Sequence, residues 1–230
     1  MTQKGEGTAG ATVDPVRVPE KRWPMAVAVL VTIVLQVITP KDGRLLRWWA
    51  IPVLELLALA AVIVRDPGRI DRRTRAARRA TVVLLVVMTI ATLGGLALLM
   101  LQILDANYEV ADASAILGRG AALWVTNVLV FSLWYWELDR GGAAERAAGS
   151  GIAPSFGFPE EAMPELVPDG WIPRYPDYLY LSFTGATAFS PTDTLPIRTW
   201  AKMTLMAEST ISLLVALFVI ARAINELQPG

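Results

Sequence analysis

The amino-acid sequence predicts an all-α integral membrane protein with about five transmembrane helices and one re-entrant, pore-like segment. Hydrophobic residues make up 54% of the 230-residue chain and charged residues only 18%, and the charges cluster between long apolar runs. A soluble helix pairs an apolar stripe with a polar face, whereas several segments here are apolar on all sides. Five such helices in a chain of this length cannot all bury one another, so lipid is expected to cover them.

The transmembrane prediction rests on run length, because a bilayer core of about 30 Å is crossed by about 20 apolar residues in a helix. The clearest run covers 80–104, and the shortest covers 23–39 and stops at Pro40. Trp134, Tyr135 and Trp136 close the fourth run, as expected for an interfacial aromatic belt. The predicted spans are 23–39, 45–64, 80–104, 116–136 and 199–224.

The polar segments divide the chain into four regions and predict its orientation. Residues 65–79 hold seven arginines and two acids, and an excess of positive charge marks a cytoplasmic loop. Counting helices from this loop places the N-terminus and the long loop after the fourth helix inside, and the C-terminus outside. The predicted regions are a disordered tail at 1–22, a four-helix membrane region at 23–137, a Gly/Pro-rich acidic loop at 138–176, and a re-entrant segment with the last transmembrane helix at 177–230.

The re-entrant segment is predicted for residues 178–189. This apolar stretch has about twelve residues, which is too few to cross a membrane, and Pro191 and Pro196 follow it. A short helix that turns back at membrane depth needs protein or a water-filled cavity around it.

The stretch 177–227 resembles the pore helix, filter loop and inner helix of tetrameric, potassium-type cation channels. Tyr180, Phe183, Thr184 and Thr187 match the pore-helix pattern, Asp193 matches the acid after the filter, and an apolar helix follows. The stretch is also similar to a family of bacterial multi-pass membrane proteins of unknown function. The resemblance implies a homo-oligomer, in particular a tetramer, that conducts inorganic ions.

The filter itself departs from that family. Residues 188–192 read Ala-Phe-Ser-Pro-Thr and contain no glycine. Potassium filters aim rings of backbone carbonyls at the ion, and glycine permits the left-handed backbone that this requires. Pro191 also fixes its own φ near −65°. A potassium-selective filter is therefore excluded, and the loop is expected to present hydroxyls and one acid.

Candidate site residues follow from this loop and from two acids within the spans. Thr187, Ser190, Thr192 and Asp193 are expected to line the path, although Asp193 can equally close an Asx-type turn. Intramembrane carboxylates mark functional sites by default. Glu55 can alternatively be protonated and bonded to a neighbouring helix, and Glu208 either faces the re-entrant loop or extends to the interface beside Lys202.

Composition excludes several kinds of chemistry. The chain has no Cys and no His, which removes thiolate and imidazole metal ligands, and its formal net charge of zero gives no reason to expect nucleic acid as a partner. We expect no metal, no cofactor and no enzymatic activity, and membrane lipid as the main partner. The predicted function is a pore or ion channel in the cell membrane. The alternatives are a non-conducting scaffold or accessory protein, or a small-solute transporter using Glu55 and Glu208.

Overall fold

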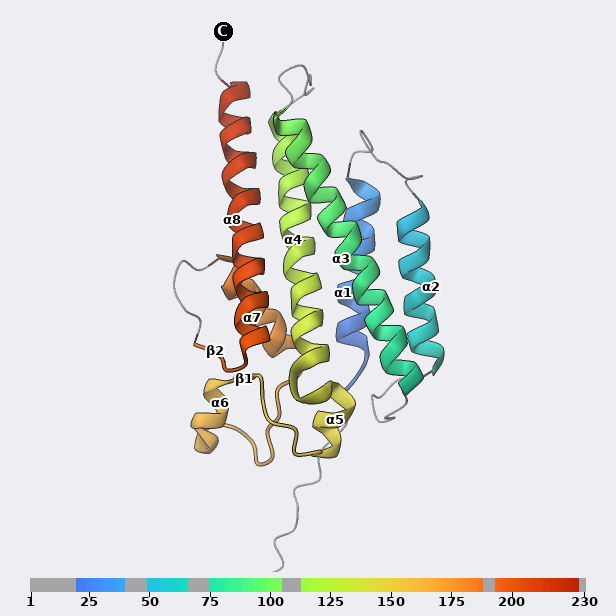
Figure 1. Ribbon diagram of the computed structural model, residues 1–230, viewed down its shortest axis with the longest axis vertical. Coiled ribbons are helices and arrows are strands. Elements are labelled where there is room, and N and C mark those ends of the chain that lie inside the picture. Colours follow the sequence, from blue (N-terminus) through green and yellow to red (C-terminus); the bar gives the residue numbers. More distant parts are fainter. Residues whose placement is uncertain (1–19, 40–48, 66–74, 105–112, 188–192, 228–230) are drawn as a thin grey trace, which may run out of the picture.

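The computed structural model describes residues 20–39, 49–65, 75–104, 113–187 and 193–227, and these fold mainly into helices (Figure 1). The long elements are α1 (Trp23–Ile38), α2 (Ala50–Arg65), α3 (Arg75–Leu104), α4 (Ala113–Leu138) and α8 (Thr199–Leu227). The shorter ones are η1 (Asp139–Gly141), α5 (Ala143–Ala148), β1 (Phe156–Gly157), α6 (Pro159–Ala162), η2 (Pro164–Leu166), α7 (Tyr175–Thr187) and β2 (Leu195–Pro196).

Helix α4 is the centre of the bundle. It packs against α1 and α3 on one side and against α7 and α8 on the other. Helix α2 lies at one edge and α8 at the opposite edge, while α5, α6, β1 and β2 gather at one end (Figure 1). That end is called the entry end below. It also holds the beginnings of α1, α3 and α8 and the end of α4.

Each of the five predicted spans corresponds to a helix, although Thr39 and Trp49 lie just outside α1 and α2. Three described segments are long and apolar enough to cross a membrane: Ala76–Leu104, Ser114–Ala148 and Thr199–Arg222. Helices α1 and α2 have 16 residues each, which gives a length of about 24 Å at 1.5 Å per residue. The predicted start of the second span at 45–48 lies outside the described residues.

The ends of α1 and α4 follow from local sequence. Thr39, after α1, is extended with ψ 133°, because the residue before a proline is disfavoured in the α region. After α4 the chain turns through Arg140, Gly141 and Gly142, all of which have positive φ. Glycine adopts this conformation without strain, so the two glycines allow α4 to end sharply and α5 to fold back.

Helix α7 begins three residues before the predicted start at Tyr178. Proline is compatible with the first turn of a helix, so Pro176 does not prevent the earlier start. Asp177 accepts a hydrogen bond from the Arg174 N–H at 2.6 Å, which satisfies a donor that the helix itself leaves unpaired. The predicted end at 188–189 lies outside the described residues.

Two predicted polar regions are more ordered than expected. The loop predicted at 138–176 contains α5, β1 and α6, and β1 pairs antiparallel with β2, with Gly157 opposite Leu195. At the end of the predicted disordered tail, Glu20 and Arg22 are buried. Both differences arise from long-range contacts at the entry end.

Candidate functional site

Helix α7 enters the bundle and the chain returns to the same end. Its 13 residues extend about 20 Å at 1.5 Å per residue, which is less than the bilayer core of about 30 Å. Tyr175 begins α7 at the entry end, and Leu195 is back at that end because β2 pairs with β1 (Figure 1). Helix α7 is therefore a short helix that packs against α4 and α8, with the chain before it and after it at the same end of the bundle.

One carboxyl group joins the three helices of this unit. Glu208 of α8 is fully buried and accepts a hydrogen bond of 2.6 Å from the hydroxyl of Tyr135 on α4. Its other oxygen is hydrogen-bonded to the hydroxyl of Ser182 on α7. Of the two positions predicted for Glu208, the structure shows the one that faces α7, the helix that was predicted to be re-entrant.

The same face of α7 approaches α8 closely at Gly185. A Cβ atom at this position would lie 3.0 Å from Leu205 Cδ1 and 3.6 Å from a Glu208 carboxyl oxygen. Ser209 Oγ also donates a hydrogen bond of 2.8 Å to the Gly185 carbonyl. The absence of a side chain at Gly185 therefore allows the close approach of α7 to Leu205 on α8.

Glu55 has a separate environment. It is fully buried, and Gln36 Nε2 donates to its two oxygens at 2.9 and 3.1 Å, which links α2 to α1. This matches the alternative in which Glu55 bonds to a neighbouring helix. Because α2 and α8 lie at opposite edges of the bundle (Figure 1), the structure does not bring Glu55 and Glu208 together.

Of the four predicted path residues, the structure describes Thr187, the last residue of α7, and Asp193. Thr187 is exposed at the last turn, and its hydroxyl donates to the Phe183 carbonyl at 2.8 Å. Ser190 and Thr192 lie outside the described residues. Asp193 is exposed where the described chain resumes.

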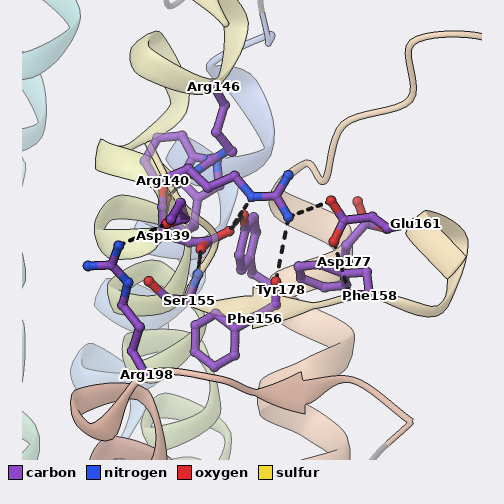
Figure 2. A network of polar contacts seen from close by, with 12 residues as sticks. Asp139, Arg140, Arg146, Ser155, Phe156, Phe158, Glu161, Asp177, Tyr178 and Arg198 are labelled. Atoms are coloured by element: carbon purple, nitrogen blue, oxygen red, sulfur yellow. Dashed lines mark hydrogen bonds and ion pairs between the residues drawn. The ribbon is translucent and has the colours of Figure 1, made fainter. Parts of the chain in front are cut away.

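A buried polar cluster holds the start of α7 at the entry end (Figure 2). Asp139 is completely buried and accepts hydrogen bonds from the Ser155 N–H at 2.7 Å and the Tyr178 hydroxyl at 2.6 Å. Arg140 Nε lies 3.4 Å from the same carboxylate, and its Nη2 pairs with Glu161 at 2.6 Å. Asp139 thus connects the end of α4 to the loop before β1 and to α7.

Arg146 is a further charged group of this cluster. It donates to the carbonyls of Trp136 at 2.7 Å and Asp139 at 2.9 Å, and its guanidinium lies 4.9 Å from the centre of the Tyr178 ring. Its Nη2 is 3.6 Å from Glu20. A buried guanidinium with carbonyl, carboxylate and aromatic partners keeps its charge compensated.

Glu20 attaches the N-terminal segment to the start of α7. Its oxygens accept hydrogen bonds from the Tyr175 N–H at 2.6 Å and from the Trp136 indole at 2.9 Å. Burial raises the pKa of Glu20 above its ordinary value, although these two donors and the charges of Arg146 and Arg174 act in the opposite direction. Because the Glu20 carboxyl bonds to the first residue of α7, its protonation state is expected to affect how firmly the start of α7 is held.

The raised pKa of Glu20 predicts a specific pH dependence. A group whose pKa is higher in the folded state contributes stability below its unfolded value of about 4.3, and that stability is lost as pH rises through the folded pKa. We expect Glu20→Gln to remove this decline, measured by unfolding in detergent across acidic to neutral pH. Glu165→Gln, at an exposed acid, is the control. An unchanged slope in Glu20→Gln contradicts the prediction.

The sequence prediction included Glu208 but missed its partners Tyr135 and Ser182 and the cluster around Asp139. One local signal was available for the cluster, because Asp139 and Arg140 follow an aromatic helix end and precede two glycines. Glu20 gave no local signal, since its partners lie more than a hundred positions away.

Neither the fold nor the sequence is matched in the comparisons. No protein-family model, curated protein or solved structure matches the chain. Within the residues that the structure describes, no group of three or more Asp, Glu, His or Cys side chains is placed to hold a metal ion.

Proposed function

We propose that this chain is a pore-type protein of the cell membrane, with α1, α2, α3, α4 and α8 as spans and α7 as a re-entrant helix. The observation that carries the proposal is the path of α7, which enters for about 20 Å between α4 and α8 and returns to the end where it began. An outer helix, a half-length helix and an inner helix packed together form the unit that the channel resemblance implies. The apolar segments in α3, α4 and α8 support the membrane setting.

The entry end is proposed to face the cytoplasm. The arginine-rich stretch 65–79 connects α2 to α3, and Arg78 lies 3.8 Å from Glu137 at the end of α4. The start of α7 contacts the same helix end through Glu20 and Trp136. By the positive-inside rule, α7 enters from the cytoplasmic side, opposite to the re-entrant loop of common cation channels.

The path is proposed to run along the inner end of α7, lined by Thr187, Ser190, Thr192 and Asp193, and to pass inorganic ions. The last carbonyls of a helix have no partner within the helix, and at membrane depth they need protein or water. Helices α7 and α8 lie at one edge of the bundle (Figure 1), and Tyr180 on the outer face of α7 is 53% exposed. A homo-oligomer, in particular a tetramer, would bring these edges together around a wet axis.

Ion flux tests the proposal directly. Purified protein in liposomes, loaded with a sodium- or potassium-sensitive dye, is expected to carry a cation flux. Asp193→Asn is expected to change the rate or the sodium/potassium ratio several-fold, because it removes the negative charge from the path. Asp169→Asn, at an exposed acid in the loop after η2, is expected to conduct like the natural chain.

Each outcome has a defined meaning. No flux from folded, incorporated protein would make the pore proposal wrong and favour a non-conducting scaffold. Flux that is unaffected by Asp193→Asn would remove this residue from the path. Flux abolished by both Glu55→Gln and Glu208→Gln, with the fold intact, would favour a transporter.

A further inference from the structure

The hydroxyl of Ser182 lies within hydrogen-bond distance of two oxygen atoms and has one hydrogen to donate. Ser182 Oγ is 2.7 Å from the carbonyl oxygen of Val128 on α4 and is hydrogen-bonded to the carboxyl of Glu208 on α8. A serine hydroxyl donates one hydrogen and accepts through its lone pairs. A carbonyl oxygen only accepts, so the Ser182 hydrogen cannot satisfy both neighbours.

A protonated Glu208 places a hydrogen in each of the three contacts that join Tyr135, Glu208, Ser182 and Val128. If Glu208 carries a proton, its hydroxyl donates to Ser182 Oγ, and Ser182 donates onward to the Val128 carbonyl. The other carboxyl oxygen accepts from Tyr135. If Glu208 is ionised, Ser182 turns its hydrogen to the carboxylate and the contact with Val128 loses its hydrogen.

No cation compensates a negative charge on the buried Glu208 carboxyl among the described residues. The groups that act on this carboxyl within the described residues are the hydroxyls of Ser182 and Tyr135, and no charged side chain is among them. Tyr135 is the titratable neighbour from α4, whereas α7 presents Ser182 and Gly185, which do not titrate. Asn127, also uncharged, donates to the Glu208 backbone carbonyl at 3.5 Å. A buried carboxylate without a cation is costly.

We infer that Glu208 is a proton-binding site whose occupancy seats α7 against α4 and α8. On deprotonation the O–H bond of the carboxyl breaks, the electron pair stays on Glu208, and the proton passes to water. The chain of hydrogen bonds from Glu208 through Ser182 to Val128 then opens, and α7 loosens so that water reaches the charge. If this movement controls the pore, the pore opens or closes with pH, and this part of the inference rests on the proposed function.

Cysteine labelling measures the seating of α7 without any flux. The chain has no cysteine, so Leu181→Cys reports a completely buried position on α7, and Phe183→Cys reports a position that is 49% exposed on the same helix. The ratio of maleimide labelling at the two sites corrects for the faster reaction of thiols at higher pH. With Glu208 present, this ratio is expected to rise several-fold as pH increases.

The decisive comparison repeats the labelling in a protein that also carries Glu208→Gln. A glutamine amide donates to Ser182 and accepts from Tyr135 as the protonated acid does, so α7 is expected to stay seated and the ratio to stay flat. A ratio with the same pH dependence in both backgrounds would overturn the inference. If the labelling ratio depends on pH only when Glu208 is present, and the protein carries no ion flux, the proton-binding site would be supported and the pore proposal would be wrong.

Infrared spectroscopy supplies a second readout on the chain without cysteines. We expect a carbonyl stretch of a protonated carboxylic acid that disappears in Glu208→Gln, or shifts in Glu208→Asp if the glutamine variant does not fold. A neutral-pH spectrum in which neither substitution alters a protonated-acid band would show that Glu208 is ionised and would overturn the inference.

Discussion

Replacing Asp139 with alanine is expected to lower the free energy of unfolding by about 3–5 kcal/mol, the range for breaking a buried ion pair, because it also leaves the Ser155 N–H and the Tyr178 hydroxyl without their acceptor. Asp139 is fully buried, and its carboxylate accepts from Ser155 and Tyr178 beside Arg140. Its loss leaves Arg140 with one acid, the more exposed Glu161 (Figure 2). Chemical unfolding in detergent, followed by tryptophan fluorescence, measures the change.

Two variants separate the charge from the shape of the side chain. Asp139→Asn keeps the volume and one acceptor, so we expect a smaller loss than for alanine. Asp169→Ala removes an exposed acid and is expected to change stability by less than about 0.5 kcal/mol. A similarly small loss for Asp139→Ala would show that the cluster does not hold the start of α7.

Gly120→Ala is expected to cost about 1–3 kcal/mol, as overpacking of a close contact usually does. A Cβ atom at Gly120 of α4 would lie 2.6 Å from both methyl groups of Val219 on α8. Valine is stiff at χ1, so the methyl groups cannot easily rotate away and the helices must separate. The two helices meet here in an apolar cluster that includes Ile116 and Val215.

Gly118→Ala, two residues earlier on the same helix, provides a matched control. Nothing lies within 4 Å of a Cβ atom at this position, so the substitution is expected to gain up to about 1 kcal/mol from helix propensity. The difference between the two variants isolates the α4–α8 contact. It should appear as a gap of several degrees in the thermal midpoint, at about 2–4 °C per kcal/mol for a chain of this size. Equal midpoints would contradict the close approach.

The helices could be predicted from the sequence because their signals are local. A continuous apolar run forms a helix whatever it packs against, and α8 begins at Thr199 as predicted. Helix boundaries that depend on capping were predicted less accurately. An example is the start of α7, where the Asp177 side chain bonds back to the Arg174 N–H. The 138–176 loop was predicted from its glycines and prolines, and that composition does not indicate the short elements within it.

The candidate site was predictable only in part, since its contacts join distant segments. Glu208 stands out because it is an acid in an apolar run, but its partners Ser182 and Tyr135 lie 26 and 73 positions away. A serine and a tyrosine in such segments have many possible roles, so their pairing could not be predicted. Gln36, the partner of Glu55, also lies on another helix, 19 positions away.

The bond between Glu20 and Tyr175 has a consequence for how a nascent chain matures. The two residues are separated by 155 positions, and ribosomes add about 5–20 residues per second, so translation reaches Tyr175 about 8–30 s after Glu20. Helix α7, which is too short to span a bilayer alone, must in turn await the later synthesis of Glu208. Both contacts of α7 therefore form late in synthesis, and packing of α7 onto α4 and α8 is expected to be among the last steps of folding.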